Sequence, residues 1–190
     1  MTLLVKNLSC FLSGRKIFSD ISFSLKTGEI LKISGENGSG KTTLLRTISG
    51  LSSFESGEIL INKKEIFLLG HNTGIKQNLT VEEDLEFWSN FYQNEHDNKI
   101  LKKLSLNSKI HSQCRYLSQG QKQKLALTRL FCSNKKIWLL DEPFSFLDEE
   151  SSSFLVNEIE NHRQNNGIII LVSHQNLIKN PDLSINLGDQ

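Results

Sequence analysis

The sequence has few of the residues that mark a metal-bound, disulfide-linked or membrane-embedded protein. Its three cysteines, Cys10, Cys114 and Cys132, are far apart and form no C-x-x-C pair, which argues against a metal site or a disulfide framework. No apolar run approaches the roughly 20 residues needed to cross a bilayer. We therefore expect the cysteines to be small buried hydrophobic residues in a reducing compartment.

An excess of one charge and a targeting segment are lacking as well. The formal net charge of the 190 residues is +1, so no basic field indicates a nucleic-acid partner. Residues 1–6 lack the cationic start and apolar stretch of a signal peptide, and we expect the protein to stay on the side of the membrane where it is made. With 37% hydrophobic and 23% charged residues, a single globular domain spanning residues 1–190 is expected.

The hydrophobic pattern predicts an α/β fold. Residues 137–140 and 168–172 are unbroken apolar runs, which is typical of strands buried on both faces. Strands alternate with helical segments in this last third of the chain, which predicts a parallel sheet. The first seventy residues are rich in shorter β pieces. We expect strands at 3–5, 21–25, 29–33, 58–61, 65–69, 137–140 and 168–172.

The middle of the chain predicts helices. Thr80 and Glu83 fit a capping box, and Leu85, Trp88 and Tyr92 then recur at helical spacing. A second helical piece follows near 100–104. Because both flanks are rich in strands, we interpret residues 72–113 as a helical subdomain inserted into the α/β core. Further helices are expected at 42–49, 118–131 and 149–165.

A glycine-rich loop carries the most specific motif. Residues 35–42 fit G-x-x-x-x-G-K-[ST] between an expected strand and a helix, so backbone N–H groups and the helix N-terminus can cradle phosphate oxygens. Lys41 would bind the β and γ phosphates of ATP, and the Thr42 hydroxyl would bind Mg²⁺. The candidate nucleotide-binding residues are Gly35, Glu36, Asn37, Gly38, Ser39, Gly40, Lys41, Thr42 and Thr43.

Two acidic residues follow the apolar run 137–140. Asp141 and Glu142 lie at the carboxyl end of an expected parallel strand, where open α/β sheets bind ligands. Asp141 is the second candidate Mg²⁺ ligand, and Glu142 is placed to polarise an attacking water. The alternative is that two carboxylates merely end a strand in solvent; the glycine-rich loop elsewhere in the chain favours the ligand-binding interpretation.

Residues 117–121, Leu-Ser-Gln-Gly-Gln, resemble the LSGGQ signature of ABC ATPases, with Gln119 in place of the first glycine. Ser118 and Gln121 also form a capping box, which puts a helix N-terminus here. The resemblance implies a P-loop NTPase of the ABC type, an α/β domain with a small antiparallel β part and an inserted helical subdomain. It further implies that Ser118, Gly120 and Gln121 face the ATP held by a second protomer, most simply an identical chain.

Other landmarks of ABC ATPases occur in the same order. Residues 145–148 resemble the D-loop, and His174 resembles the switch histidine that touches the γ-phosphate. His71 occupies the position of the Q-loop glutamine; the alternative is that this histidine is only structural. The family also stacks an aromatic residue on adenine, for which Phe11 and Phe18 are the candidates. With Glu142, the two histidines complete the expected catalytic set.

A narrower resemblance rests on residues 69–76, Leu-Gly-His-Asn-Thr-Gly-Ile-Lys, and on residues 140–144. Both are similar to the ATP-binding subunits of cytochrome c maturation systems. This implies an ATPase that energises a membrane ABC transporter complex of c-type cytochrome biogenesis, for haem export or haem-chaperone release. It would sit peripherally on the cytoplasmic face of the inner membrane, or on the matrix face in a mitochondrion, against an integral membrane subunit.

Three alternatives stay open. The chain could be a soluble ABC ATPase of cofactor or iron–sulfur assembly, the ATPase of an unrelated ABC exporter, or a regulator that binds ATP without turnover. The aromatic stripe on the expected helix after Thr80 has two interpretations as well, a groove for the membrane partner or the core of the helical subdomain. The stripe consists of Phe87, Trp88, Phe91 and Tyr92.

Overall fold

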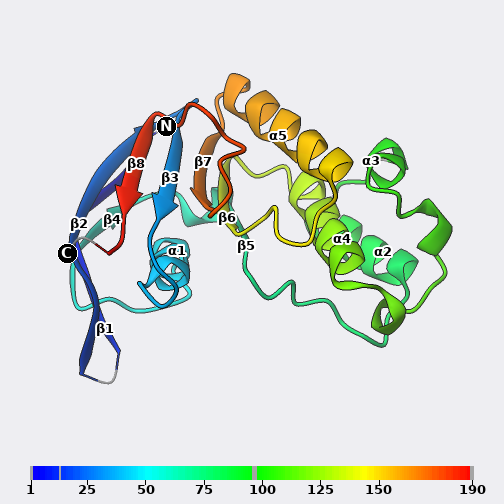
Figure 1. Cartoon of the computed structure of the whole chain (residues 1–190), viewed down its shortest axis with the longest axis horizontal. Helices are drawn as coiled ribbons and strands as arrows, with labels where there is room; N and C mark the ends of the chain where they lie inside the picture. Colours follow the sequence, from blue (N-terminus) through cyan, green and yellow to red (C-terminus); the bar gives the residue numbers. More distant parts are fainter. Residues whose placement is uncertain (1, 13, 96–97, 189–190) are drawn as a thin grey trace.

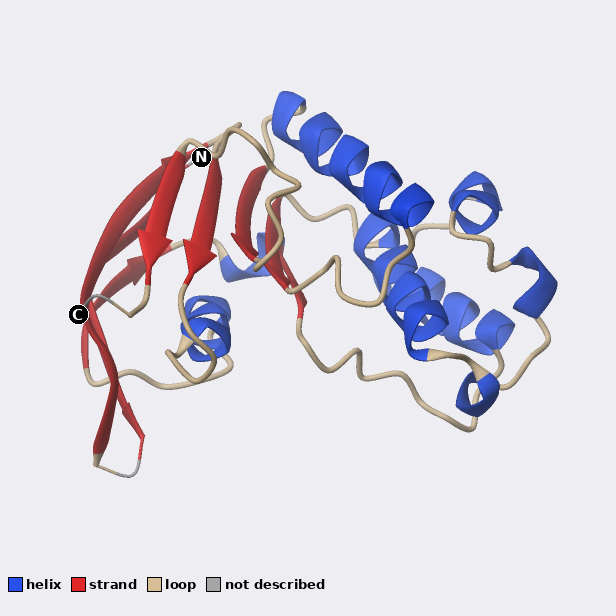
Figure 2. Cartoon of the chain, viewed as in Figure 1, coloured by secondary structure: helices blue, strands red, loops and turns tan. Residues whose placement is uncertain are grey.

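A computed structural model of the chain describes residues 2–12, 14–95 and 98–188. Two sheets lie on one side of the molecule and most of the helices on the other (Figure 1). The carboxyl ends of the parallel strands face the loops that carry the expected site. Figure 2 shows strands in red and helices in blue, with the long helix α5 (Glu149–Gln164) crossing above the other helices on the right.

Five parallel strands form the larger sheet in the order β5-β6-β7-β3-β8. The strand before the glycine-rich loop, β3, and the strand that ends in the acidic pair, β6, are separated only by β7. Because all five strands run the same way, the loops that follow them leave from one edge. The strands are β3 (Ile30–Ser34), β5 (Ile66–Leu69), β6 (Ile137–Asp141), β7 (Ile168–Val172) and β8 (Leu183–Asn186).

The smaller sheet is antiparallel, in the order β2-β1-β4. Its strands β1 (Thr2–Leu12) and β2 (Arg15–Lys26) form a long hairpin, and β4 (Ser56–Leu60) pairs with β1. The sequence predicted much shorter strands, 3–5 and 21–25. Register shifts interrupt the hairpin after Val5 and after Leu8, and each bulge breaks the period-2 alternation from which strands are recognised.

Two hydrophobic clusters cover the two faces of the parallel sheet. Along β6 and β7, alternate side chains point to opposite clusters, as the unbroken apolar runs predicted. Ile137 and Leu139 pack toward helix α1 and the antiparallel sheet, whereas Trp138 and Leu140 pack toward the helical layer. The sheet is therefore clamped between α1 with the β hairpin on one face and the longer helices on the other.

The helix ends follow the predicted signals. Thr80 caps α2 in a reciprocal pair with Glu83, and Ser118 caps α4 in the same way with Gln121. α1 ends at Gly50, whose φ of 83° lies in the left-handed region. The helices are α1 (Lys41–Ser49), α2 (Val81–Tyr92), α3 (Asn98–Lys103), α4 (Gln119–Cys132) and α5 (Glu149–Gln164), with 3-10 turns at Lys63–Glu65, Asn107–Lys109 and Cys114–Tyr116.

Residues 72–113, the expected helical subdomain, contain helices α2 and α3. Residues 70–80 form a loop without regular structure, the first helix begins at Val81, and α4 continues the layer to Cys132 by packing on α2. Strand β8 was not expected either. Its four residues are mostly exposed, and it is held by tertiary pairing with β3 rather than by a hydrophobic pattern.

Cys10, Cys114 and Cys132 are buried and form no disulfide, as expected. Burial raises the pKa of each thiol. Within residues 2–12, 14–95 and 98–188, the structure contains no helix long and apolar enough to cross a membrane.

His162, on helix α5, stacks against a tryptophan of strand β6. The His162 ring lies 3.7 Å from the Trp138 ring, centroid to centroid, at an interplanar angle of 5°. Its Nε2–H donates to the carbonyl of Lys136 over 3.1 Å. Burial lowers the pKa of His162 to about 4, and the hydrogen bond offsets this only in part.

We expect the free energy of unfolding to fall as the pH drops from about 6.5 to about 4, because the unfolded chain takes up the His162 proton near pH 6.5 and the folded chain only near pH 4. The contribution is present above pH 6.5. His162→Phe keeps a ring against Trp138 and should flatten this part of the profile, measured by urea unfolding at several pH values. The same exchange at exposed His111 is the control; equal slopes for all three proteins would contradict the assignment.

Candidate nucleotide site

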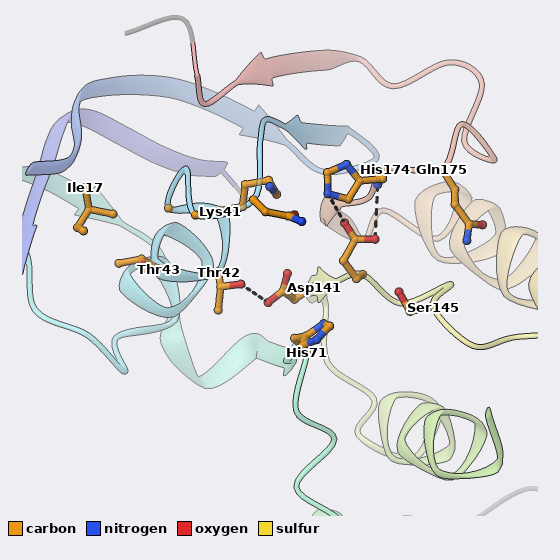
Figure 3. Close-up of a pocket in the computed structure, with 13 residues that line it drawn as sticks. Ile17, Lys41, Thr42, Thr43, His71, Asp141, Ser145, His174 and Gln175 are labelled. Atoms are coloured by element: carbon orange, nitrogen blue, oxygen red, sulfur yellow. Dashed lines mark hydrogen bonds and ion pairs between the residues drawn. The ribbon is translucent and has the colours of Figure 1, made fainter. Parts of the chain in front are cut away.

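A cavity of about 540 Å³ lies at the carboxyl edge of the parallel sheet, where the loops after β3, β5, β6 and β7 meet (Figure 3). Open α/β sheets bind ligands at this edge. The residues that line it come from five parts of the chain: strand β2, the phosphate loop with the start of α1, and the loops after β5, β6 and β7. They are Ile17, Asn37, Gly38, Gly40, Lys41, Thr42, Thr43, His71, Asp141, Glu142, Ser145, His174 and Gln175.

The glycine-rich loop wraps closely because two of its glycines have no room for a side chain. Gly40 has a φ of 95°, and a Cβ there would lie 2.7 Å from the Cγ2 of Ile17. Gly35 has a φ of 142°, and its Cβ would lie 2.6 Å from the Leu187 carbonyl. Gly40, at the end of this loop, is the N-cap of α1, and no side chain caps the helix. The first N–H groups of the helix can therefore donate hydrogen bonds to an anion.

Two polar groups of this loop fit a phosphate ligand. The ammonium of Lys41 donates to the carbonyls of Gly35 and Glu36, each over 2.7 Å, and so is held at the loop. The Ser39 hydroxyl oxygen is buried and has no hydrogen-bond partner among the described residues. A buried hydroxyl without a partner costs free energy, and a phosphate oxygen is a partner of the right kind.

The Thr42 hydroxyl donates to the Asp141 carboxylate over 2.7 Å. Asp141 is 3% exposed and ends β6, so the sheet brings the two oxygens together from positions 99 residues apart. Oxygen ligands suit Mg²⁺, which is commonly held by one or two protein oxygens together with substrate phosphates. In the described part of the chain, no group of three or more His, Cys, Asp or Glu residues forms a metal cage.

Glu142 follows directly in a strained backbone conformation, with a φ of 51°. Its N–H donates to the carbonyl of Val172 over 2.9 Å, which ties it to β7. His174 approaches its carboxylate through the backbone N–H at 3.5 Å and through Nε2 at 3.7 Å. Glu142 Oε1 is buried without a hydrogen-bond partner among the described residues, and such an oxygen can accept a proton from a bound water.

His71 lines the cavity below Asp141 (Figure 3). The next side chain, Asn72, lines a separate hollow and accepts a hydrogen bond from the Gly74 N–H over 3.1 Å. Neither aromatic candidate for the adenine lines the cavity: Phe18 is 4% exposed in the core, and Phe11 lies outside the lining set. Ile17, the residue before Phe18, lines the cavity instead. The sequence missed it because an aliphatic residue in a strand gives no sign of ligand contact.

The signature residues lie apart from this cavity. Ser118, Gly120 and Gln121 are absent from its lining, and the first and last of these cap α4, through hydrogen bonds of 2.9 Å and 3.2 Å. Gly120 packs against the loop after β6, since a Cβ there would lie 2.6 Å from the Phe146 carbonyl. Within one chain the expected site residues therefore form two separate groups.

Helix α4 and the loop after β6 are tied together. Gln123 Nε2 donates to the Pro143 carbonyl over 3.0 Å, and Lys124 bonds the Asp148 carboxylate over 2.5 Å. Hydrogen bonds from Lys124 and Ser151 lower the pKa of Asp148 to about 2. Asp148 also caps α5 through Ser151 N–H, so one carboxylate joins the two helices at the loop between them.

Known proteins resemble this chain in sequence and in fold. The profile of the ABC transporter family matches residues 18–145. The cytochrome c biogenesis ATP-binding export protein CcmA of Vibrio cholerae is 40% identical over 97% of this chain and 98% of its own length. The protein of the same name from Saccharophagus degradans is 36% identical over 90% of this chain and 86% of its own length.

Two solved structures agree in fold. A Pyrococcus furiosus protein described as an ABC transporter ATP-binding protein superposes with a TM-score of 0.82 at 27% identity, over 98% of both chains. A structure titled as the ATP binding subunit of an ABC transporter gives a TM-score of 0.87 at 23% identity, over 99% of this chain and 86% of its own. This second likeness supports the fold alone.

The close contact at Gly120 leads to a prediction. A methyl group there must displace the Phe146 carbonyl, so we expect Gly120→Ala to lower ATP hydrolysis by about 100-fold, in line with the effect of ångström-scale misplacement. Binding of ATP, measured by fluorescence of a nucleotide analogue, should be unchanged because the cavity lies elsewhere. Gln119→Ala, an exposed position in the same helical turn, is the control. Hydrolysis equal to wild type in Gly120→Ala would show that the contact is not needed.

Proposed function

Because the chain belongs to the ABC transporter family, we propose that it is the ATP-hydrolysing subunit of a membrane transporter complex of c-type cytochrome biogenesis. The observation that carries the proposal is the cavity at the sheet edge. It combines the phosphate loop, the Thr42–Asp141 oxygen pair and the Glu142–His174 pair. The assignment to cytochrome c biogenesis follows the names of relatives that match over nearly the whole chain.

ATP would bind with its phosphates against residues 35–43. The N-terminus of α1 and the Lys41 ammonium supply positive charge there, and the hydroxyl of Ser39 gains a partner. Thr42 and Asp141 are the residues that would hold Mg²⁺, an ion that neutralises phosphate charge during hydrolysis. Ile17 would contact the base side by packing rather than by aromatic stacking.

Hydrolysis needs positioning more than covalent chemistry. Glu142 would orient and polarise the attacking water through Oε1, which is buried and accepts no hydrogen bond from the described residues. His174 would fix the Glu142 carboxylate from the loop after β7 and contact the γ-phosphate. His71 would reach the same region from the loop after β5. These three side chains arise from three neighbouring strands, so small shifts of the sheet edge affect them together.

The separation of the signature residues from the cavity supports a site built from two chains. We propose that a second copy brings Ser118, Gly120 and Gln121 to the phosphates held by the first, and that each copy does so for the other. The α4 N-terminus would then add its N–H groups to the γ-phosphate. The exposed rings of Tyr116 and Phe146, beside this helix end, suit burial in such an interface.

The aromatic stripe on α2 supports a docking place for the membrane subunit. Phe87 and Phe91 are 49% and 64% exposed, whereas Trp88 and Tyr92 are half-buried. The stripe therefore has a core side, formed by Trp88 and Tyr92, and a surface side, formed by Phe87 and Phe91. A hollow of about 330 Å³ between β5, residues 70–74 and α2 adjoins the stripe. We propose that the membrane subunit binds here, which would place the protein peripherally on the cytoplasmic face of the membrane.

Glu142→Gln should bind ATP and hydrolyse it about 100-fold more slowly, since a positioned general base contributes at least that factor. We expect the tagged variant, incubated with ATP and detergent-solubilised native membranes, to retain a multispanning subunit together with cytochrome c maturation proteins. Mass spectrometry identifies what is retained. A soluble assembly scaffold in place of a membrane protein would support the alternative of an assembly ATPase and contradict the transporter proposal.

The same pull-down tests the docking surface. Adding Phe87→Ala and Phe91→Ala should abolish capture of the membrane subunit and leave ATP binding intact, because neither ring lines the nucleotide cavity. Phe54→Ala removes another exposed phenylalanine, 40% exposed, from a different face and should leave capture unchanged. Equal losses in both variants would show a general effect of surface aromatic residues.

A mixing experiment tests the two-chain site. Lys41→Ala removes the phosphate cation and Gly120→Ala disturbs the signature, so each variant alone should be inactive. In a random mixture half of the dimers contain one of each, and each mixed dimer has one intact composite site, so up to about a quarter of wild-type ATPase activity should return. No recovery at any ratio, with mixed dimers demonstrated by dual tags, would contradict a site shared in this way.

A further inference from the structure

An ion pair buried in the helical layer joins α4 to α2. The guanidinium of Arg129 donates from Nε to one Asp84 oxygen over 3.1 Å and from Nη2 to the other over 2.6 Å. The two side chains are 8% and 3% exposed. Arginine can fill both oxygens of a carboxylate in this way because its donors form a planar fork.

The remaining nitrogen of the guanidinium, Nη1, faces the loop after β5, which reaches the nucleotide cavity at His71. Arg129 Nη1 donates to the carbonyl of Thr73 over 2.8 Å. Thr73 lies two residues from His71, which lines the cavity. The far end of the same loop is anchored separately, by backbone bonds from Cys114 to Leu79 and from Arg115 to Gln77. Arg129 thus holds the near end, the part that carries His71.

The same guanidinium lies over the ring of Trp88, with the central carbon 4.9 Å from the centroid. Trp88 belongs to the aromatic stripe, and its ring contacts those of Phe87 and Phe91 at 5.2 Å and 5.5 Å. One side chain of the signature helix therefore contacts the loop of His71 and the helix that carries the exposed rings. Stability alone gives weak reason for such a pair, since packed apolar residues often replace buried ion pairs without loss.

We propose that Arg129 is a positioning residue for ATP hydrolysis, which fixes His71 in the cavity through the Thr73 carbonyl and links that position to α2 and the signature helix. The proposal rests on the proposed ATPase function. Arg129 itself is not among the residues that line the nucleotide cavity. Its effect on catalysis passes through the loop that contains Thr73 and His71. A movement of α2 therefore also moves His71.

Arg129→Lys separates this role from simple packing. A lysine ammonium keeps the positive charge for Asp84, so no buried carboxylate is left unpaired, but one nitrogen cannot serve both carboxylate oxygens and the Thr73 carbonyl. In the intact complex we expect kcat for ATP to fall about tenfold while KM changes less than about twofold, because the phosphate loop is untouched. In the purified chain, the ring signals of His71 in NMR spectra should shift, and those of His174 should not.

Arg163→Lys is the matched control. Arg163 also bonds a carboxylate, Asp182, at 3.0 Å and a backbone carbonyl, Gly28, at 3.2 Å, and it lies outside the cavity lining. This variant should leave kcat and the His71 signals as in wild type. A thermal melt of each variant verifies folding at the assay temperature.

Two results overturn the inference. Unchanged kcat and unchanged His71 signals in folded Arg129→Lys, with active wild type, would show that the arginine only packs the helices. Equal shifts of His71 in Arg163→Lys would show a general response to lost charge. If wild type itself fails to bind or hydrolyse ATP, the proposed function fails, and that outcome is distinct because it appears before any variant is compared.

Discussion

The burial of β6 and β7 on both faces is the constraint on which the rest of the structure depends. Their ten residues are all buried, so each face of the sheet must be covered by a separate layer. Helix α1 and the antiparallel sheet cover one face, and α2, α4 and α5 cover the other. Polar side chains are thereby restricted to the strand ends. The acidic pair, the loop of His174 and the phosphate loop consequently share one edge.

The same architecture explains why the site divides into two groups. The phosphate loop belongs to the first layer through α1, and the signature belongs to the second layer through α4. The sheet lies between these layers, so the two groups are held apart within one chain. A second copy, as proposed above, would bring a signature to each phosphate loop and leave both layers intact.

The sequence predicted those parts of the fold and site that depend on local chemistry. The glycine spacing of residues 35–42 predicts a phosphate loop. The capping boxes at Thr80 and Ser118 predict helix starts, and the structure contains both capping boxes. Other features depend on partners distant in the chain. Strand β8 exists because β3 offers an edge, and Ile17 lines the cavity because strand β2 passes close to Gly40 of the phosphate loop. Arg129 is of the same kind, since its partners lie 45 and 56 residues away.

Helix α4 carries one partly exposed ion pair and one buried ion pair. The difference affects how the signature residues are coupled to the residues of the nucleotide cavity. Lys124 bonds Asp148, whose side chain is 58% exposed, so water and salt screen the pair and it contributes little to stability. Arg129 and Asp84 are shielded from water, and removal of one partner would cost about 3–5 kcal/mol. The helix is thus held to α2 by an ion pair shielded from water, and to the loop after β6 by a more exposed pair together with the buried Gln123–Pro143 hydrogen bond. A rigid-body shift of α2 should therefore carry the signature helix with it.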